Sequence, residues 1–374
     1  MNRMQKWLSP VMFCIILFGL SGWLLFSGSR EYSQTEKRYL TKPPQWDWNA
    51  VMEGRFQQQL EDWTADQFPA RDLWVSIHGY AQLLTGRNSL QDVYLCKDGY
   101  LISAPAGQDL TVFQNNLKRF DDFAGACEVP VSMILVPSGG WLKEELLPAG
   151  HLTYPDDEQF AFAKEALEHI ALIDPREPLK QADMIRPVQY RTDHHLTAYG
   201  SYILSNCWWE HLGLPAAAES DFQVETSEGF YGSSWSGSGY RLTKPDTLEL
   251  WSTDTPVQVT ITDPGKEEIR SDSLFFRDHL KELDQYPVYL DGNHCQTVIE
   301  NSQGTEGTLL VLKDSYAHCV ATMLAERYER IILMDLRYYR GEVSKLIKEY
   351  DVDQVLFLYG TSTLLTDTNS AWLF

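Results

Sequence analysis

The stretch TLLVLKDSY, from Thr308 to Tyr316, decides how the rest of the chain is interpreted. Its first five residues are apolar or β-branched and stop at Lys313-Asp314, which predicts a buried strand that ends at the edge of its sheet. Apolar residues recur at helical spacing behind Ser315, so we expect this serine at a strand-to-helix turn. Backbone N–H groups at a helix start lack helical partners, so such a turn places an anion site beside the serine hydroxyl.

A serine at a helix start most often serves only as an N-cap, so catalysis requires partners for Ser315. The segment RTDHHLT, from Arg191 to Thr197, supplies them. If this segment is extended, Asp193 and His195 point the same way and His194 points the opposite way. An aspartate beside a histidine fixes the tautomer of the ring and stabilises its protonated form, as in serine triads. The candidate catalytic residues are therefore Ser315, His195 and Asp193.

The Asp-His-His cluster has two other interpretations. It can simply cap the helix that is expected to open near Thr197. A metal site made of Asp193, His194 and His195 with the distant His294 or His318 has no diagnostic spacing. We therefore expect neither a metal nor a cofactor.

The last third of the chain alternates strands and helices. Strands are expected at 308–312, 330–334 and 354–359, with helices at 316–328 and 342–349 between them. This order predicts βαβ units and a parallel sheet, which an earlier strand at 131–136 would join. Sites in such sheets form at the carboxyl ends of the strands. The polar residues expected at that edge are Ser315, Asp335 with Arg337, Gly360-Thr361-Ser362 and Ser138.

Residues 8–26 form an uncharged apolar run close to the length that crosses a bilayer, which predicts a membrane anchor or an export signal. Basic residues flank this run on both sides, so charge does not decide its orientation. We expect a single-pass membrane protein whose body is extracytoplasmic. The expected divisions are the anchor or signal at 1–30, a linker and helical region at 31–105, and an α/β domain at 106–374. This domain contains a β-rich insertion at about 221–285.

The overall charge limits the partners of the protein. The chain has 31 basic and 52 acidic residues, a formal charge of -21, which repels nucleic acid phosphates and anionic lipid surfaces. We therefore exclude nucleic acid as a partner. The six cysteines are widely spaced and include no C-x-x-C pair, so neither a disulfide framework nor a zinc site is indicated, although one bridge remains open.

Several motifs, in order along the chain, resemble the bacterial DHHW protein family. They are FPARD at 68–72, TDHHLT at 192–197, GNH at 292–294, KDSYA at 313–317, MDLRYY at 334–339 and VLFLYG at 355–360. That family is similar to the SGNH-hydrolase-like domains of alginate O-acetyltransferases. The sequence departs from the family pattern at Leu196, where the family name expects Trp, and at Lys313, where the relatives have Gly before Asp-Ser.

The resemblance implies an SGNH-hydrolase-like α/β fold and roles for individual residues. Asp193 and His195 would orient and deprotonate Ser315, which would accept an acyl group and pass it on. The backbone N–H of Ser315 or Tyr316 is the first candidate for binding the oxyanion. Further oxyanion or substrate candidates are Asn293, Arg337 and His194, although Arg337 can equally pair with a carboxylate such as Asp335.

We therefore expect an extracytoplasmic, membrane-anchored O-acyltransferase or esterase that acts on a cell-surface polysaccharide, with acetyl as the transferred group. The resemblance implies that a membrane-bound O-acyltransferase partner supplies this group. The competing hypothesis is a non-catalytic envelope protein that binds glycan or such a partner. It is supported by the aromatic content of the chain and by Tyr231, Trp235 and Tyr240 in the insertion.

Overall fold

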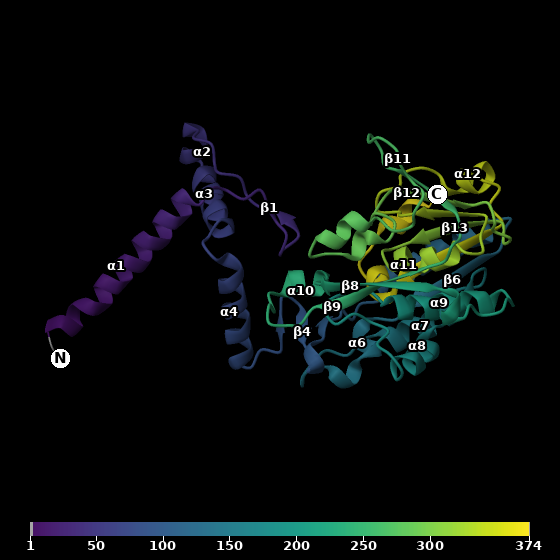
Figure 1. Cartoon of the computed structure of the whole chain (residues 1–374), viewed down its shortest axis with the longest axis horizontal. Helices are drawn as coiled ribbons and strands as arrows, with labels where there is room; N and C mark the ends of the chain where they lie inside the picture. The colour runs from purple at the N-terminus through teal and green to yellow at the C-terminus, as the bar shows by residue number, and fades with distance from the viewer. Residues whose placement is uncertain (1–2, 374) are drawn as a thin grey trace. The chain divides into compact units, whose positions relative to one another are not determined.

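The computed structural model describes residues 3–373, which divide into two compact units (Figure 1). The first, called the helical unit, contains the residues up to Leu90 together with Ser236–Arg241. The second, called the α/β unit, contains Gln91–Trp235 and the residues from Leu242 onward.

An eight-stranded sheet forms the centre of the α/β unit. Its strands, in spatial order, are β11 (Ile269–Ser271), β10 (Val257–Thr262), β12 (Gln296–Asn301), β14 (Arg330–Met334), β13 (Thr308–Lys313), β15 (Gln354–Gly360), β6 (Val131–Val136) and β7 (Ala171–Ile173). The five strands from β14 to β7 are parallel, and β12, β10 and β11 extend the sheet in antiparallel pairs. The predicted parallel sheet is confirmed.

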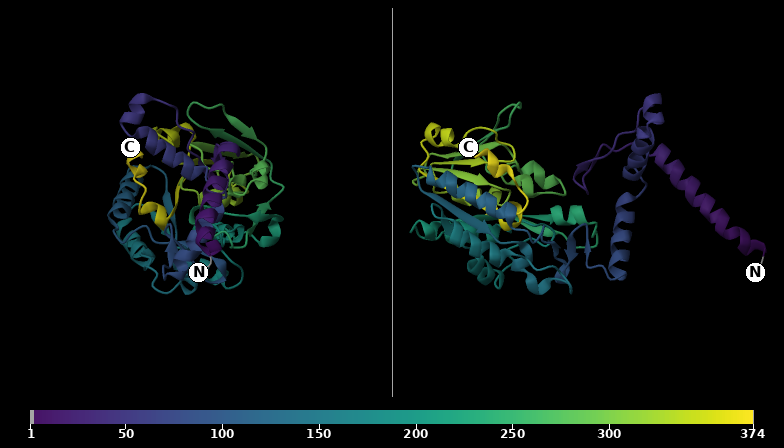
Figure 2. Two further views of the ribbon diagram at one scale, coloured as in Figure 1. Left: turned by 90° about the vertical axis from the view of Figure 1, so that its left-hand side faces the viewer. Right: turned by 180° about the vertical axis from the view of Figure 1, so that it is seen from behind.

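Helices cover both faces of this sheet (Figure 2). The helices are α5 (Thr111–Gly125), α7 (Asp156–Ala166), α9 (Ala198–His211), α11 (Ala317–Leu324) and α12 (Val343–Glu349). Because successive side chains of a strand point to opposite faces, β13 contributes side chains to two hydrophobic cores, one on each face of the sheet. Leu309 and Val311 join the core that contains α9 and α11, whereas Leu310 and Leu312 join the core that contains α5, α7 and α12. Strands covered on both faces must be apolar at every position, which explains the unbroken TLLVL run.

The remaining elements of the α/β unit are smaller. They are β4 (Val93–Leu95), β5 (Leu101–Ser103), α6 (Gly139–Leu142), α8 (Arg176–Asp183), β8 (Gln223–Phe230), β9 (Asp246–Ser252) and α13 (Thr361–Leu364). In the region expected to be a β-rich insertion, β8 and β9 form a two-stranded ribbon, while β10 and β11 extend the main sheet. A short helix, α10 (Ser233–Ser238), lies between β8 and β9 in the chain.

The helical unit contains α1 (Arg3–Phe26), β1 (Tyr32–Ser33), β2 (Arg38–Tyr39), α2 (Trp48–Met52), α3 (Arg55–Asp66), α4 (Arg71–Leu84) and β3 (Ser89–Leu90). Within α1, the window Trp7–Leu24 is long and apolar enough to cross a membrane, and none of it is buried. This helix has the properties of a membrane anchor or of a signal sequence.

All six cysteines of the chain are free, so the one disulfide left open by the sequence is not formed in the structure.

Candidate active site

Ser315 lies in the turn between β13 and α11, as predicted, and it is partly exposed in an otherwise buried stretch. The turn is fastened by the buried carboxylate of Asp314. This carboxylate accepts hydrogen bonds from the N–H of Tyr316 at 3.0 Å, the N–H of Gly360 at 2.8 Å and the hydroxyl of Thr363 at 2.6 Å. The end of β13 is thereby tied to the end of β15, which gives the serine a rigid base.

Lys313 stands at the position where the family resemblance predicts a glycine before Asp-Ser. The turn does not require a glycine here, since Lys313 is not among the residues with positive φ. Its buried ammonium group donates to Nε2 of His318 at 2.6 Å and lies 3.4 Å from Oδ2 of Asp335. Burial lowers the pKa of Lys313, and burial together with the nearby lysine charge lowers the pKa of His318 well below its ordinary value. The departure from the family pattern therefore leaves the serine turn intact.

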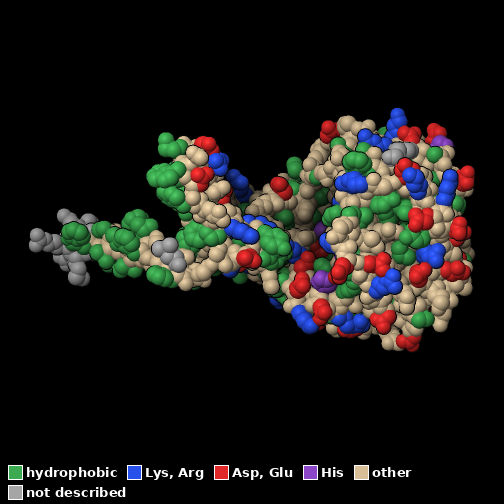
Figure 3. Space-filling view, turned by 90° about the horizontal axis from the view of Figure 1, so that it is seen from above, with side chains coloured by type: hydrophobic (Ala, Val, Ile, Leu, Met, Phe, Trp, Pro, Cys, Tyr) green, Lys and Arg blue, Asp and Glu red, His purple; other side chains and the backbone are tan. Residues whose placement is uncertain are grey.

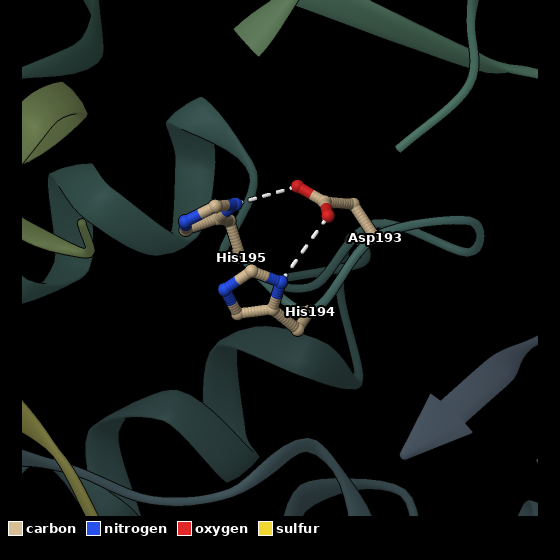
Figure 4. Close-up of side chains that lie close together, drawn as sticks. All are labelled: Asp193, His194 and His195. Atoms are coloured by element: carbon tan, nitrogen blue, oxygen red, sulfur yellow. Dashed lines mark hydrogen bonds and ion pairs between the residues drawn. The ribbon is translucent and has the colours of Figure 1, made fainter. Parts of the chain in front are cut away.

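The structure brings Ser315, His195 and Asp193 together, although 120 residues separate His195 from Ser315. Oγ of Ser315 lies 2.7 Å from Nε2 of His195, and Nδ1 of the same ring lies 2.6 Å from Oδ2 of Asp193. An ionised carboxylate only accepts hydrogen bonds, so Nδ1 carries the ring proton and Nε2 accepts from the serine hydroxyl. Figure 4 shows the contact between Asp193 and His195. This is the arrangement in which a histidine can take the proton of a serine nucleophile.

Burial and neighbouring charges set the protonation states of this pair. Burial, reinforced by the adjacent His194, lowers the pKa of His195 to about 4, even though Asp193 acts in the opposite direction. Burial alone would raise the pKa of Asp193, but the two histidines hold it well below its ordinary value. At neutral pH the site therefore contains an ionised aspartate and a neutral imidazole, which are the states that a base requires.

The prediction that His194 points away from Asp193 and His195 is wrong. Nδ1 of His194 lies 3.3 Å from Oδ1 of Asp193, and the centroids of the two histidine rings are 3.8 Å apart (Figure 4). The segment is bent rather than extended, so alternation of side chains does not apply to it. One candidate ligand atom from each of the three residues lies within 4.8 Å of the others, as in a metal site. The protonated Nδ1 of His195 and the hydrogen-bonded carboxylate are already engaged, which favours a proton-transfer network.

Ser233 and Asp246 also hold the aspartate loop, and no local pattern in the sequence indicates either residue. Oδ1 of Asp193 accepts hydrogen bonds from the hydroxyl and, at 2.9 Å, from the N–H of Ser233, whose hydroxyl in turn lies 2.7 Å from Nδ1 of His194. A Cβ on Gly232 would lie 2.1 Å from Cβ of Asp193, so only glycine allows this approach. Asp246 accepts from the N–H groups of Arg191 and Thr192 at 2.9 and 2.8 Å.

Tyr286 is the residue of the site that sequence reasoning missed most completely. Its buried ring is stacked on the ring of His195, with centroids 3.8 Å apart and an interplanar angle of 7°. Its hydroxyl donates to the backbone carbonyl of Ser315 at 3.3 Å. One side chain therefore contacts both the proposed base and the backbone of the proposed nucleophile. Nothing in the local pattern of the sequence distinguishes this tyrosine from an ordinary core aromatic residue.

We predict that the ring of Tyr286 matters more than its hydroxyl. Tyr286→Leu removes the stacked plane and should lower the acylation rate of Ser315 by about 10- to 100-fold, because a misplaced base costs about this much. Tyr286→Phe keeps the plane and loses one hydrogen bond of about 1 kcal/mol, so its rate should fall by less than about 10-fold. Stopped-flow release of p-nitrophenol from an activated acetyl ester measures both rates. Equal losses in the two variants would contradict the importance of the ring.

The oxyanion candidates have different environments. The N–H of Tyr316 donates to Asp314, so it is engaged in the turn, whereas the N–H of Ser315 makes no hydrogen bond within residues 3–373. Arg337 pairs with Asp335 at 2.6 Å and donates to Oδ1 of Asn293 at 3.1 Å. The structure contains the pairing of Arg337 with Asp335, and the role of Arg337 as an oxyanion or substrate residue stays a prediction. The hydroxyl of Tyr316 donates to the carbonyl of His194 at 2.9 Å, which braces the histidine loop.

Ser138 and Thr361 reach the same sheet edge but have structural partners. The buried carboxylate of Asp156 accepts from the hydroxyl of Ser138 at 2.6 Å and from the hydroxyl of Thr361 at 2.9 Å. Burial raises the pKa of Asp156. These contacts join the ends of β6 and β15 and place neither serine nor threonine beside a histidine.

Comparisons with known proteins agree with this architecture. Residues 179–334 match the model of the family described as DHHW protein. A DHHW family protein from Eubacterium siraeum is 21% identical, with a TM-score of 0.63 over 75% of this chain and 94% of the other. PatB1 from Bacillus cereus, solved with a sulfonyl adduct, is 21% identical, with a TM-score of 0.64 over 75% of this chain and 97% of its own.

The O-acetyltransferase domain of Pseudomonas putida AlgJ is more distant. It is 16% identical, with a TM-score of 0.47 over 74% of this chain and 92% of the domain, which is too distant to support an argument about function. A comparison with curated protein sequences gave no match.

Leu196, which stands where the family name expects Trp, is buried in the core and keeps the apolar character of the position. The family match and the shared fold confirm the resemblance of this chain to the DHHW protein family.

Proposed function

We propose that this protein is an O-acyltransferase or esterase that works through an acyl group on Ser315. The observation that carries the proposal is the continuous hydrogen-bond chain from Asp193 through His195 to Ser315, with contacts of 2.6 and 2.7 Å. The partial exposure of Ser315 lets a substrate reach the hydroxyl, while His195 and Asp193 stay buried. The family resemblance supports an acetyl group as the transferred unit and a cell-surface polysaccharide as the acceptor.

The proposed reaction has two halves. Oγ of Ser315 attacks the carbonyl carbon of an acyl donor as its proton moves to Nε2 of His195. The resulting oxyanion expels the alcohol of the donor, which takes the proton from His195 and leaves an ester on Ser315. A sugar hydroxyl then attacks this ester, gives its proton to His195 and departs acylated, while Ser315 regains its proton. Water in place of the sugar gives an esterase.

The competing non-catalytic hypothesis loses one of its supports. Trp235 and Tyr240, two of the three aromatic residues expected to bind glycan, are buried. Stacking of a sugar needs an exposed aromatic face, and Trp235 instead contacts the ring of Tyr231 at 4.3 Å. The acidic charge of the chain is compatible with either hypothesis.

A sulfonyl fluoride tests the proposed nucleophile, since a sulfonyl adduct is found on PatB1. We expect phenylmethanesulfonyl fluoride to modify the peptide that contains Ser315, and to do so neither in Ser315→Ala nor in His195→Gln. Ser362 provides a matched internal control, because it is exposed in α13, which follows the neighbouring strand β15, and it has no histidine partner in the described structure. Modification of Ser362 in preference to Ser315 would contradict the proposal.

Activity should persist into unusually acidic solution. A base works only when neutral, and the pKa of His195 is lowered to about 4, so activity falls as the pH drops through about 4 and is flat above about 5. His194 contributes to this lowering, so His194→Gln should move the acid limb to higher pH. The pH dependence of acetyl ester turnover measures both positions. An acid limb at the ordinary histidine pKa of about 6.5 would show that burial does not control this base.

A further inference from the structure

The outward face of α4 carries no charged side chain. Leu73, Trp74, Ile77 and Leu84, called the α4 stripe, are 57%, 48%, 49% and 90% exposed. Their spacing places them on one side of the helix, and the other exposed residues of α4 are His78 and Ala81. The solvent face of a helix in a soluble protein normally carries charged and polar residues. This face therefore has the composition of a covered surface.

Two residues of α4 outside the stripe have partners within the helical unit. The ring of Tyr80 meets the ring of Tyr240 edge-on at 5.8 Å. Gly79 lies so close to Leu90 that a Cβ on the glycine would be 2.5 Å from the leucine side chain. The α4 stripe therefore stays exposed in the folded helical unit, and only a surface outside the described fold can cover it.

Contacts within the helical unit fasten the start of α4 to the end of α1. The amide group of Gln67 accepts from the N–H of Arg30 and donates to the carbonyl of Arg30, both at 2.9 Å, four residues after α1 ends. Phe68 faces α1 across a cavity of about 240 Å³ that is lined otherwise by α1 residues, including Leu20 and Leu24. The corner from which α4 begins therefore lies against the apolar helix that is the candidate membrane span.

The composition of this region also suits a lipid surface. Trp46 and Trp48 are 64% and 68% exposed, and with Trp74 they supply the aromatic side chains that prefer the boundary between lipid and water. Up to residue 90 the chain has 9 basic and 8 acidic residues, so the net negative charge of the protein comes entirely from the residues that follow. Figure 3 shows hydrophobic side chains along α1 and over the helices of this unit. The repulsion expected from the overall charge does not apply to this surface.

We propose that the α4 stripe lies in the interface of the bilayer that α1 crosses. The protein then has two membrane contacts, a spanning helix and the apolar face of an interfacial helix. The second contact limits how far the chain that follows α4 can move from the membrane surface. The proposal does not depend on acyl transfer, so either can fail without the other.

The test uses the full chain reconstituted as single copies in nanodiscs of phosphatidylethanolamine and phosphatidylglycerol with a photoreactive diazirine phospholipid. After illumination and digestion, we expect lipid adducts on the α1 peptides and on the peptides of the α4 stripe. A peptide containing Met184 and Ile185, which are 81% and 82% exposed in the α/β unit, serves as the matched control. The stripe should be labelled at least about 10-fold more than this control, as expected for residues inserted among acyl chains.

A triple variant, Leu73→Ser with Ile77→Ser and Leu84→Ser, should lose the labelling of α4 and keep that of α1. The paired variant Met184→Ser with Ile185→Ser should leave α4 labelling unchanged, and circular dichroism checks the fold of both. Adducts on α1 with no more label on the wild-type stripe than on the control would overturn the proposal. Coverage of the stripe by a protein partner or by a second copy predicts that same result, since the nanodiscs contain neither.

Discussion

Replacing His195 with glutamine is expected to lower the rate at which Ser315 becomes acylated by about 10⁴- to 10⁶-fold, the range seen when a triad base is lost. Glutamine keeps a polar group near Oγ of Ser315 but cannot accept its proton at neutral pH. The rate is measured as the burst of p-nitrophenol from p-nitrophenyl acetate. An unchanged burst in a variant that unfolds at the same temperature as the wild type would remove His195 from the mechanism.

His194→Gln is the matched control for this variant. His194 is adjacent in sequence, has a ring next to that of His195 and contacts the same aspartate. Oγ of Ser315 forms its hydrogen bond with His195 instead. We expect the acylation rate of His194→Gln at neutral pH to change by less than about 10-fold. The side chain of His194 affects acylation only indirectly, by altering the charge and position of the neighbouring residues. Equal losses in the two variants would mean that the loop, rather than the Nε2 contact, determines activity.

Asp193→Asn should lower acylation by about 10⁴-fold, because it reverses the tautomer of the base. The asparagine amide can donate to Nδ1 of His195, which places the ring proton on Nε2 and removes the acceptor that Ser315 needs. Ser233→Ala is the control, since it removes one hydrogen bond from Asp193 but leaves the carboxylate in place. We expect Ser233→Ala to lose less than about 10-fold, the effect of one such bond. Full activity of Asp193→Asn with an intact fold would contradict the assigned tautomer.

The elements that depend on local pattern were predictable from the sequence. The strands Arg330–Met334 and Val131–Val136 have the predicted ends. A strand that is covered on both faces is an apolar run, and the run stops at the polar residues that flank it. Helix ends were less accurate. The helix expected at 316–328 is Ala317–Leu324, since apolar residues continue into the turn that follows it. Apolar periodicity records burial, and burial does not stop where the helical hydrogen bonds stop.

The site was predictable in its residue types and not in its geometry. Sequence motifs pointed to Asp193, His195 and Ser315, and the structure places them in hydrogen-bond contact. The bend that turns His194 toward Asp193 depends on Ser233, which lies 40 residues away, and the plane of the base is set by Tyr286, which is 91 residues from it in the sequence. Contacts of this kind leave no local periodicity. The buried pairing of Lys313 with His318 is likewise a product of packing, and a lysine in the sequence indicates only a charge.

Trapping the acyl-enzyme tests the central claim most directly. The full chain is mixed with an activated acetyl ester, quenched in acid within the first turnover, digested and examined by mass spectrometry. The account predicts one acetyl group on the peptide that contains Ser315, its absence in Ser315→Ala, and its transfer to an added polysaccharide or to water when the quench is delayed. An acetyl group found elsewhere on the chain, or found on Ser315 equally in His195→Gln, would contradict the account.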